Sequence, residues 1–197
     1  MSPRSKSFDV NDALSRAVDV FWEQGYEGAS MQDLLERMGI SRQSLYDTFG
    51  DKRRLFLSSL QYYMDEYASM VYSELEAPGA SMDAIRNFAQ HAIESADSQV
   101  AHRACLMVNT VMEFGRKDED VAAMVQAHQR RTVAAYANAL TGAKAAGQID
   151  ADADIESLAL FMTANGLGTL VMLKSGASAE DIRRQLGTAL SFIERTE

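Results

Sequence analysis

The stretch from residue 30 to residue 56 constrains this chain more than any other, because it predicts two short helices joined by a tight turn. Ser30 can cap the first helix, Gly39 can end it in the left-handed conformation, and Ser41 can cap the second. One face of the first helix is apolar at helical spacing, through Met31, Leu34, Leu35 and Met38. This pattern predicts a helix-turn-helix, whose second helix enters the major groove of DNA.

The second helix divides into an inward face and an outward face. Leu45 and Phe49 are four residues apart and are expected to face inward. Arg42 and Gln43 can each form two hydrogen bonds with a base edge, and hydroxyl, phenol and ammonium groups nearby can hold phosphates. The expected DNA-binding residues are therefore Ser30, Ser41, Arg42, Gln43, Ser44, Tyr46, Thr48 and Lys52.

The amino-acid sequence of this region resembles that of a known family. The run GISRQSLYDTFGDKRRLF at 39–56 resembles the recognition region of the TetR family of transcriptional regulators, and ALSRAVDVFWEQGYEGASMQDL at 13–34 resembles that family's first helix. The resemblance covers about the first 60 residues. It implies a homodimeric repressor with nine helices, which a small-molecule effector releases from a palindromic DNA operator.

The rest of the chain supports an all-α fold. Only Pro3 and Pro78 occur, so little interrupts helices, and no alternation typical of strands is found. A long helix is expected from Asp51 to about Leu75. We expect an N-terminal arm and helix-turn-helix domain at 1–50, and an effector-binding and dimerisation domain at 51–197.

The net charge of −9 lies mostly outside the predicted DNA-binding part. Residues 1–60 hold eight Lys or Arg against nine Asp or Glu, a balance of about −1. Four of those cations lie at 42–54, beside the predicted recognition helix. Because phosphate binding depends on where cations are placed, the acidic total does not exclude DNA binding.

The last two predicted helices, at 154–173 and 178–193, are the expected dimer surface. Gly166 and Gly168 lie inside the first of them, where each costs roughly 0.5–1 kcal/mol relative to Ala. Close approach of another helix would explain that cost, and the family resemblance implies a four-helix bundle between two copies. An intrachain core is the alternative. The expected interface residues are Phe161, Gly168, Leu186 and Leu190.

Methionines and aromatic residues are dense in the body, which suits a flexible pocket for an apolar or aromatic ligand, although core packing explains the same pattern. Two asparagines lie among apolar residues, where a buried amide needs a partner. The candidate effector residues are Tyr63, Tyr67, Cys105, Asn109, Met112, Tyr136, Phe161 and Asn165.

Cys105 also suggests an alternative trigger. Arg103 and a helix start lie beside it, and both lower the pKa of a thiol, so a thiol- or electrophile-sensing regulator is possible. The simpler interpretation is that this single cysteine packs as a small, buried apolar side chain.

Catalysis is not expected. The chain has no glycine-rich phosphate loop, nucleophile elbow or paired-carboxylate motif. Asp150, Asp152 and Asp154 resemble the start of a calcium loop, but Ile155 and Phe161 occupy positions that need Gly and Glu. We therefore expect no metal and no cofactor. A helical ligand-binding protein or enzyme without DNA binding is the remaining alternative.

The N-terminal residues lack a long apolar run, so neither a signal peptide nor a membrane span is expected there. A single cysteine excludes an intrachain disulfide and suits a reducing compartment. We expect a cytoplasmic protein that binds double-stranded DNA and an effector, with no membrane partner.

Overall fold

The computed structural model describes residues 8–96, 98 and 103–194, and in this part of the chain all the regular elements are helices. The predicted basic arm at Arg4 and Lys6 lies outside the described residues. The chain folds into two compact units: unit 1 comprises Met1–Ala68 and Leu106–Val125, and unit 2 comprises Ser69–Cys105 and Gln126–Glu197.

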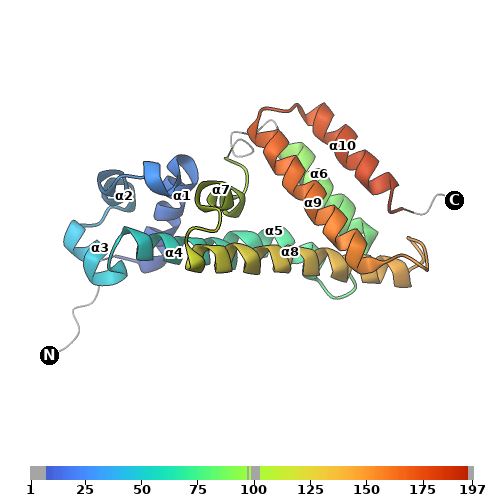
Figure 1. Ribbon diagram of the computed structural model, residues 1–197, viewed down its shortest axis with the longest axis horizontal. Helices are drawn as coiled ribbons and strands as arrows, with labels where there is room; N and C mark the ends of the chain where they lie inside the picture. The colour runs from blue at the N-terminus through green and yellow to red at the C-terminus, as the bar shows by residue number, and fades with distance from the viewer. Residues whose placement is uncertain (1–7, 97, 99–102, 195–197) are drawn as a thin grey trace. The chain divides into compact units, whose positions relative to one another are not determined.

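Unit 1 contains the predicted helix-turn-helix. Its helices are α1 (Val10–Gly28), α2 (Met31–Met38), α3 (Arg42–Phe49), α4 (Lys52–Tyr63) and α7 (Leu106–Phe114), with the first residues of α8 (Figure 1). Helix α1 packs against α2, α4 and α7, around the buried side chains of Phe21, Leu34, Leu45 and Phe56. The boundary predicted at residue 50 lies inside this unit, because α4 contributes to the same core.

The predicted caps form. The Ser30 hydroxyl accepts a hydrogen bond from the Asp33 amide at 3.1 Å, and the Ser30 amide donates back to the Asp33 carboxylate, which makes a capping box. Gly39 ends α2 with φ 68°, a left-handed conformation that glycine adopts without steric cost. Ser41 and Asp51 cap α3 and α4. The turn and the two helix starts are thus determined by local sequence.

The predicted long helix is present from Lys52 to Glu76, but one of its turns is wider than expected. Helix α4 continues into a π-helical segment, η1 (Met64–Ala68), and then into α5 (Ser69–Glu76). With this continuous helix counted once, the described residues form nine helices, as expected.

Unit 2 contains α5, α6 (Met82–Ser95), most of α8 (Glu119–Ala145), α9 (Ile155–Lys174) and α10 (Ala179–Ser191). Helix α10 packs against α6 and α9, and these three helices lie side by side (Figure 1). Their shared core consists of Ala89, Ile93, Ala96, Leu173, Ile182 and Leu186.

Helix α9 leaves much of its apolar surface uncovered. It is long and apolar enough to cross a membrane by length and composition alone, with a mean hydropathy of 1.3, yet only 22% of that window is buried. The exposed apolar side chains on α9 are Leu160, Phe161, Leu167 and Val171. In the single chain these apolar side chains are open to solvent.

Candidate nucleic-acid interface

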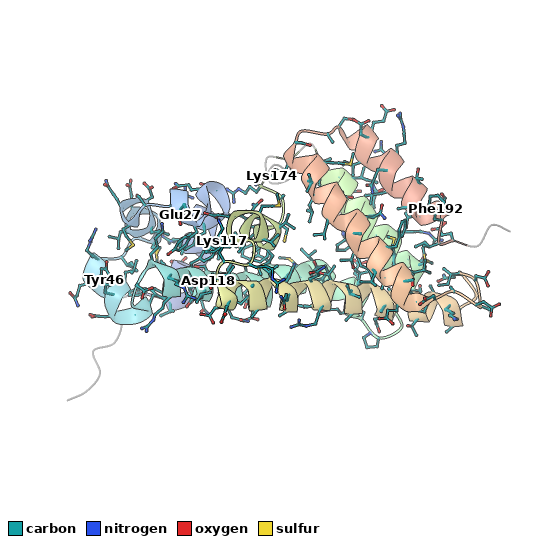
Figure 2. All side chains as sticks on the ribbon, in the orientation of Figure 1. Glu27, Tyr46, Lys117, Asp118, Lys174 and Phe192 are labelled. Atoms are coloured by element: carbon teal, nitrogen blue, oxygen red, sulfur yellow. The ribbon has the colours of Figure 1, made fainter. Side chains whose placement is uncertain are left out.

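Helix α3 presents a polar face to solvent. Leu45 and Phe49 are buried, as predicted, whereas the side chains of Arg42, Gln43 and Tyr46 are exposed. Figure 2 places Tyr46 at the outer surface of α3, where 44% of it is exposed. The outer face of the helix, which carries Arg42, Gln43 and Tyr46, is therefore free of the core and offers side chains that can enter a groove.

The hydroxyls predicted to hold phosphates also act as helix caps. Ser41 Oγ accepts from the Ser44 amide at 3.1 Å and lies 2.9 Å from Ser44 Oγ. Ser30 Oγ donates to the Asp33 carboxylate at 2.7 Å. Thr48 is half-buried on the side of α3. The phosphate contacts of these residues stay predictions, although helix N-termini favour such contacts.

Asp47 belongs to the exposed face of α3, although it was not among the predicted site residues. The Gln43 amide nitrogen Nε2 donates a hydrogen bond to Asp47 Oδ1 at 2.7 Å. This pairing of residues four apart was available from the sequence, since such side chains are neighbours on a helix surface.

The cations at the start of α4 have different environments. Lys52 Nζ lies 4.5 Å from the centre of the Tyr26 ring, a cation–π geometry that holds the ammonium group near the end of α3. The Arg53 guanidinium instead binds both carboxylate oxygens of Asp118 at 2.9 Å and also binds Asp120 at 2.6 Å. These bonds raise the pKa of Arg53 and lower the pKa of Asp118. Of these two cations, Lys52 is the better placed for phosphate binding.

Helix α7 supports the DNA-binding helices from within unit 1. The Phe114 ring stacks on Phe56 at 5.4 Å and contacts Tyr26 at 5.3 Å. The Glu113 carboxylate accepts hydrogen bonds from the backbone amides of Tyr26 and Glu27. Figure 2 shows Glu27, Lys117 and Asp118 in this region, where they line a shallow hollow with Glu113 and Phe114.

The predicted effector residues fall in both units. In unit 1, Tyr63 is buried and stacks on the Tyr67 ring at 5.7 Å, while Asn109 is half-buried and Met112 is 79% exposed on α7. In unit 2, Tyr136 is buried and Cys105 is half-buried.

Cys105 and Tyr136 belong to one series of contacting side chains in unit 2, which we call the Tyr72 cluster. Cys105 Sγ lies 3.9 Å from His128 Nε2, and the Thr132 hydroxyl donates to Tyr72 Oη at 3.0 Å. The Phe88 ring lies between the rings of Tyr72 and Tyr136. The members of the cluster are Tyr72, Phe88, Cys105, His128, Thr132 and Tyr136.

Burial controls protonation in the Tyr72 cluster. It raises the pKa of Tyr72 to about 12 and, with a smaller effect of Arg131, lowers the pKa of His128 to about 4. His128 is therefore neutral at pH 7. Its Nδ1 atom is buried with no hydrogen-bond partner in the described part of the chain. His128 and Thr132 lie four residues apart on α8, but spacing along one helix could not show that Tyr72, on α5, contacts both of them.

Phe161 and Asn165 lie elsewhere in unit 2, in an open groove between α9 and α10. Gln185 Nε2 donates to Asn165 Oδ1 at 2.9 Å, and the Thr169 hydroxyl donates to the side-chain oxygen Gln185 Oε1 at 2.9 Å. Phe161 is 39% exposed, and its ring centre lies 6.5 Å from that of Phe192, which also lines the groove and is labelled in Figure 2.

The four predicted interface residues differ in exposure. Phe161 is exposed, and Gly168 is exposed with no other atom within 4 Å of the position of a Cβ. Leu190 is half-buried, and Leu186 is buried in the core that α10 forms with α6 and α9. The surface of α9 thus offers unpartnered positions, while Leu186 contributes to the intrachain core.

Comparisons with known proteins identify both parts of the chain. Residues 13–58 match the model of the bacterial regulatory proteins of the tetR family, and residues 81–188 match that of the tetracyclin repressor-like C-terminal domain. An uncharacterized HTH-type transcriptional regulator of Bacillus subtilis (strain 168), YezE, is 35% identical over 97% of this chain and 99% of its own length.

Two further proteins are similar over nearly the whole chain. The HTH-type transcriptional repressor ComR of Escherichia coli (strain K12) is 29% identical over 95% of this chain and 90% of its own length. A cysteine mutant of the TetR family transcriptional regulator CifR was solved with 26-base-pair operator DNA. It is 28% identical and has a TM-score of 0.84 over 97% of this chain and 100% of the matched chain. Together with the exposed face of α3 and the all-helical body, these matches show that the chain belongs to the TetR family of transcriptional regulators, which are not enzymes.

Proposed function

We propose that this protein is a homodimeric repressor that binds a palindromic operator through α3 and leaves it when a small-molecule effector binds. The exposed, polar face of α3 carries the proposal, because its side chains extend from a helix held by a capped turn. The repressor ComR and the operator-bound CifR are similar over nearly the full chain, which supports the same output here.

Within this proposal Arg42 and Gln43 read bases. Arg pairs with guanine O6 and N7, and Gln pairs with adenine N6 and N7. Ser30, Ser41, Tyr46 and Lys52 hold phosphates and set the register, while Ser44 and Thr48 contact base or backbone at the sides of the helix.

Selection of DNA sequences from a random library by the purified full-length protein tests this assignment. We expect an enriched palindrome. Arg42→Ala should cost about 1–3 kcal/mol of binding and relax one operator position, whereas Lys52→Ala should weaken binding to all sequences alike. Arg130→Ala, which removes an exposed cation of α8, is the control. The absence of any enriched sequence would favour a helical ligand-binding protein that does not bind DNA.

The second copy is proposed to cover the apolar surface of α9 and the adjoining α10. Two recognition helices must reach major grooves about 34–36 Å apart, or a multiple of that, so operator binding needs the dimer. Phe161, Gly168 and Leu190 are proposed contacts, with Leu186 supporting α10 from the core. A protein of this kind works in the cytoplasm, where the DNA is, and the second copy rather than a membrane covers α9.

We place the effector against the Tyr72 cluster, where aromatic rings surround a few polar groups. The other predicted effector residues stay predictions apart from this site: Tyr63, Tyr67, Asn109 and Met112 in unit 1, and Phe161 and Asn165 in the groove between α9 and α10. The continuous helix formed by α4, η1 and α5 is the proposed link to α3. Release of DNA requires only that the effector bind the non-DNA arrangement better, typically by about 1–3 kcal/mol.

The alternative trigger is modification of Cys105. The observation behind this candidate is the 3.9 Å approach of Cys105 Sγ to His128 Nε2, a polar contact that modification of the thiol would break. Because burial lowers the pKa of His128 to about 4, the imidazole is too weak a base to activate the thiol itself. Binding assays with operator DNA distinguish the two triggers. If Cys105→Ser still releases DNA with a reversible ligand but ignores electrophiles that release the parent protein, the thiol is the sensor. Unchanged responses to both would leave the effector pocket as the only switch.

A further inference from the structure

Asp47 places a carboxylate on the face of α3 that is proposed to enter the major groove. Both Asp47 and Gln43 are exposed, and neither has a role in the core of unit 1. A carboxylate this close to DNA is repelled by phosphates, so it weakens binding to every sequence. Asp47 would therefore have to contribute something other than affinity for DNA.

Its contribution is to fix the orientation of the Gln43 side-chain amide. The distance from Gln43 Nε2 to Asp47 Oδ1 is 2.7 Å. An ionised carboxylate only accepts hydrogen bonds, so the NH₂ end of the Gln43 amide must face Asp47. One N–H of Nε2 is used in this bond, and the other N–H and the oxygen Oε1 are left for a base edge.

That remaining pair of groups matches adenine. In the major groove adenine presents an acceptor at N7 next to a donor at N6, whereas guanine presents two acceptors, N7 and O6. An amide held in one orientation can satisfy adenine, but it would face guanine with an oxygen opposite an oxygen. An amide that rotates freely can offer N–H groups to guanine as well.

We propose that Asp47 is a positioning residue that sets the base preference of Gln43 and restricts it to adenine. This inference rests on the proposed function, since it requires α3 to read DNA. It adds a residue that contacts no base itself and lowers overall affinity while raising the discrimination between bases.

Sequence selection with the full-length protein and four variants tests the proposal. Gln43→Ala identifies the operator position that Gln43 reads, because the preference there is lost. The parent protein should prefer adenine at that position by roughly 5- to 150-fold, the range of a good two-bond contact. Asp47→Ala should flatten the preference at the same position, with guanine gaining most.

Asp47→Asn tests whether the acceptor-only carboxylate sets the orientation. The new amide can accept from Gln43 Nε2 or donate to Gln43 Oε1, so we expect the preference for adenine to weaken while binding to all sequences becomes tighter. Glu36→Gln removes an exposed carboxylate of α2 and is the matched control for charge alone. It should tighten binding without changing any base preference.

The outcomes distinguish this inference from the proposed function. If the parent enriches no sequence, DNA reading by α3 is wrong. If the parent enriches an operator but Asp47→Ala keeps the parent's preference, only the role of Asp47 is overturned. A preferred base other than adenine at the Gln43 position would also overturn it. Circular dichroism of each variant verifies that α3 and its unit stay folded.

Discussion

The carboxylate of Glu113, in α7, accepts a hydrogen bond from the backbone amide of Tyr26 at 2.9 Å, 87 residues away in the sequence. A second bond of 2.7 Å comes from the amide of Glu27. Gly25 interrupts α1 just before these residues with φ 74°, so their amides lack the usual helical acceptors. One side chain of α7 therefore completes the end of α1 inside the DNA-binding unit.

We expect Glu113→Ala to lower the free energy of unfolding by about 1.5–3 kcal/mol, because two amides lose a charged acceptor. Glu113→Gln keeps one acceptor oxygen and should cost less. Urea denaturation of each protein measures these differences, with Glu36→Ala as a control for loss of an exposed carboxylate. Equal stability of Glu113→Ala and the parent would show that water replaces the carboxylate without cost.

Gly142 lies in α8 against the carbonyl oxygen of Ala80, and a Cβ atom at this position would overlap that oxygen. Ala normally gains about 1 kcal/mol over Gly inside a helix. Here the overlap is with backbone, so α8 or the turn before α6 must shift. We expect Gly142→Ala to destabilise the protein by about 1–3 kcal/mol, the usual cost of overpacking.

Gly28→Ala is the control for this change. Gly28 is the last residue of α1, and a Cβ atom there would meet the Gln24 Cβ at an ordinary contact distance of 3.6 Å. Its replacement should therefore leave the stability within about 0.5 kcal/mol of the parent. Thermal unfolding at equal protein concentration measures both variants, and a stabilising Gly142→Ala would mean that the turn at Ala80 moves easily.

The helix-turn-helix was predictable because its determinants are local. The caps by Ser30 and Ser41, the left-handed Gly39 and the inward pair Leu45 and Phe49 all act within a few residues, and the structure contains each of them. The wider π turn at 64–68 was not predicted, since the sequence there keeps ordinary helical spacing.

Contacts between distant residues explain what the sequence could not reveal about the site. Arg53 seemed one of four equivalent cations, but Asp118, 65 residues away, binds it with both oxygens. The Tyr72 cluster joins α5, α6 and α8, so no single helical pattern identifies it. Leu186 and Gly168 were likewise both predicted at the dimer interface. Only the fold shows that Leu186 lies in the core of unit 2 while Gly168 is exposed.

The burial of His128 predicts a pH-dependent stability. Its pKa is about 4 in the folded protein and 6.5 when exposed, so between these values the unfolded chain binds a proton that the folded chain does not. Stability should therefore fall as the pH drops from about 6.5 to about 4, by up to about 3 kcal/mol. His128→Gln should remove this part of the slope.

Denaturation curves between pH 4 and 7 measure the free energy of unfolding of the parent and of His128→Gln. Subtracting one value from the other at each pH cancels the contribution of the carboxylates, which both proteins share. His91→Gln, at an exposed position of α6, controls for the loss of a histidine. If the parent and His128→Gln lose stability in parallel, His128 gains its proton in the folded protein without cost.

The exposed apolar face of α9 leads to the last prediction, which concerns the dimer. Val171 is 55% exposed on α9, and Val71 is 54% exposed on α5, so the two form a matched pair. If a second copy covers α9, Val171→Asp places a charge in an apolar interface, where an unpaired charge is costly. Sedimentation should then show monomers, and operator binding should fall at the same protein concentration.

Val71→Asp should leave both the dimer and operator binding unchanged. Gly168→Leu tests the same interface by volume, since its Cβ position is open within one chain. A leucine there adds volume to the face that the second copy is proposed to cover, so this variant should also weaken the dimer. If both α9 variants sediment as the parent does, the apolar face of α9 is not where two copies meet.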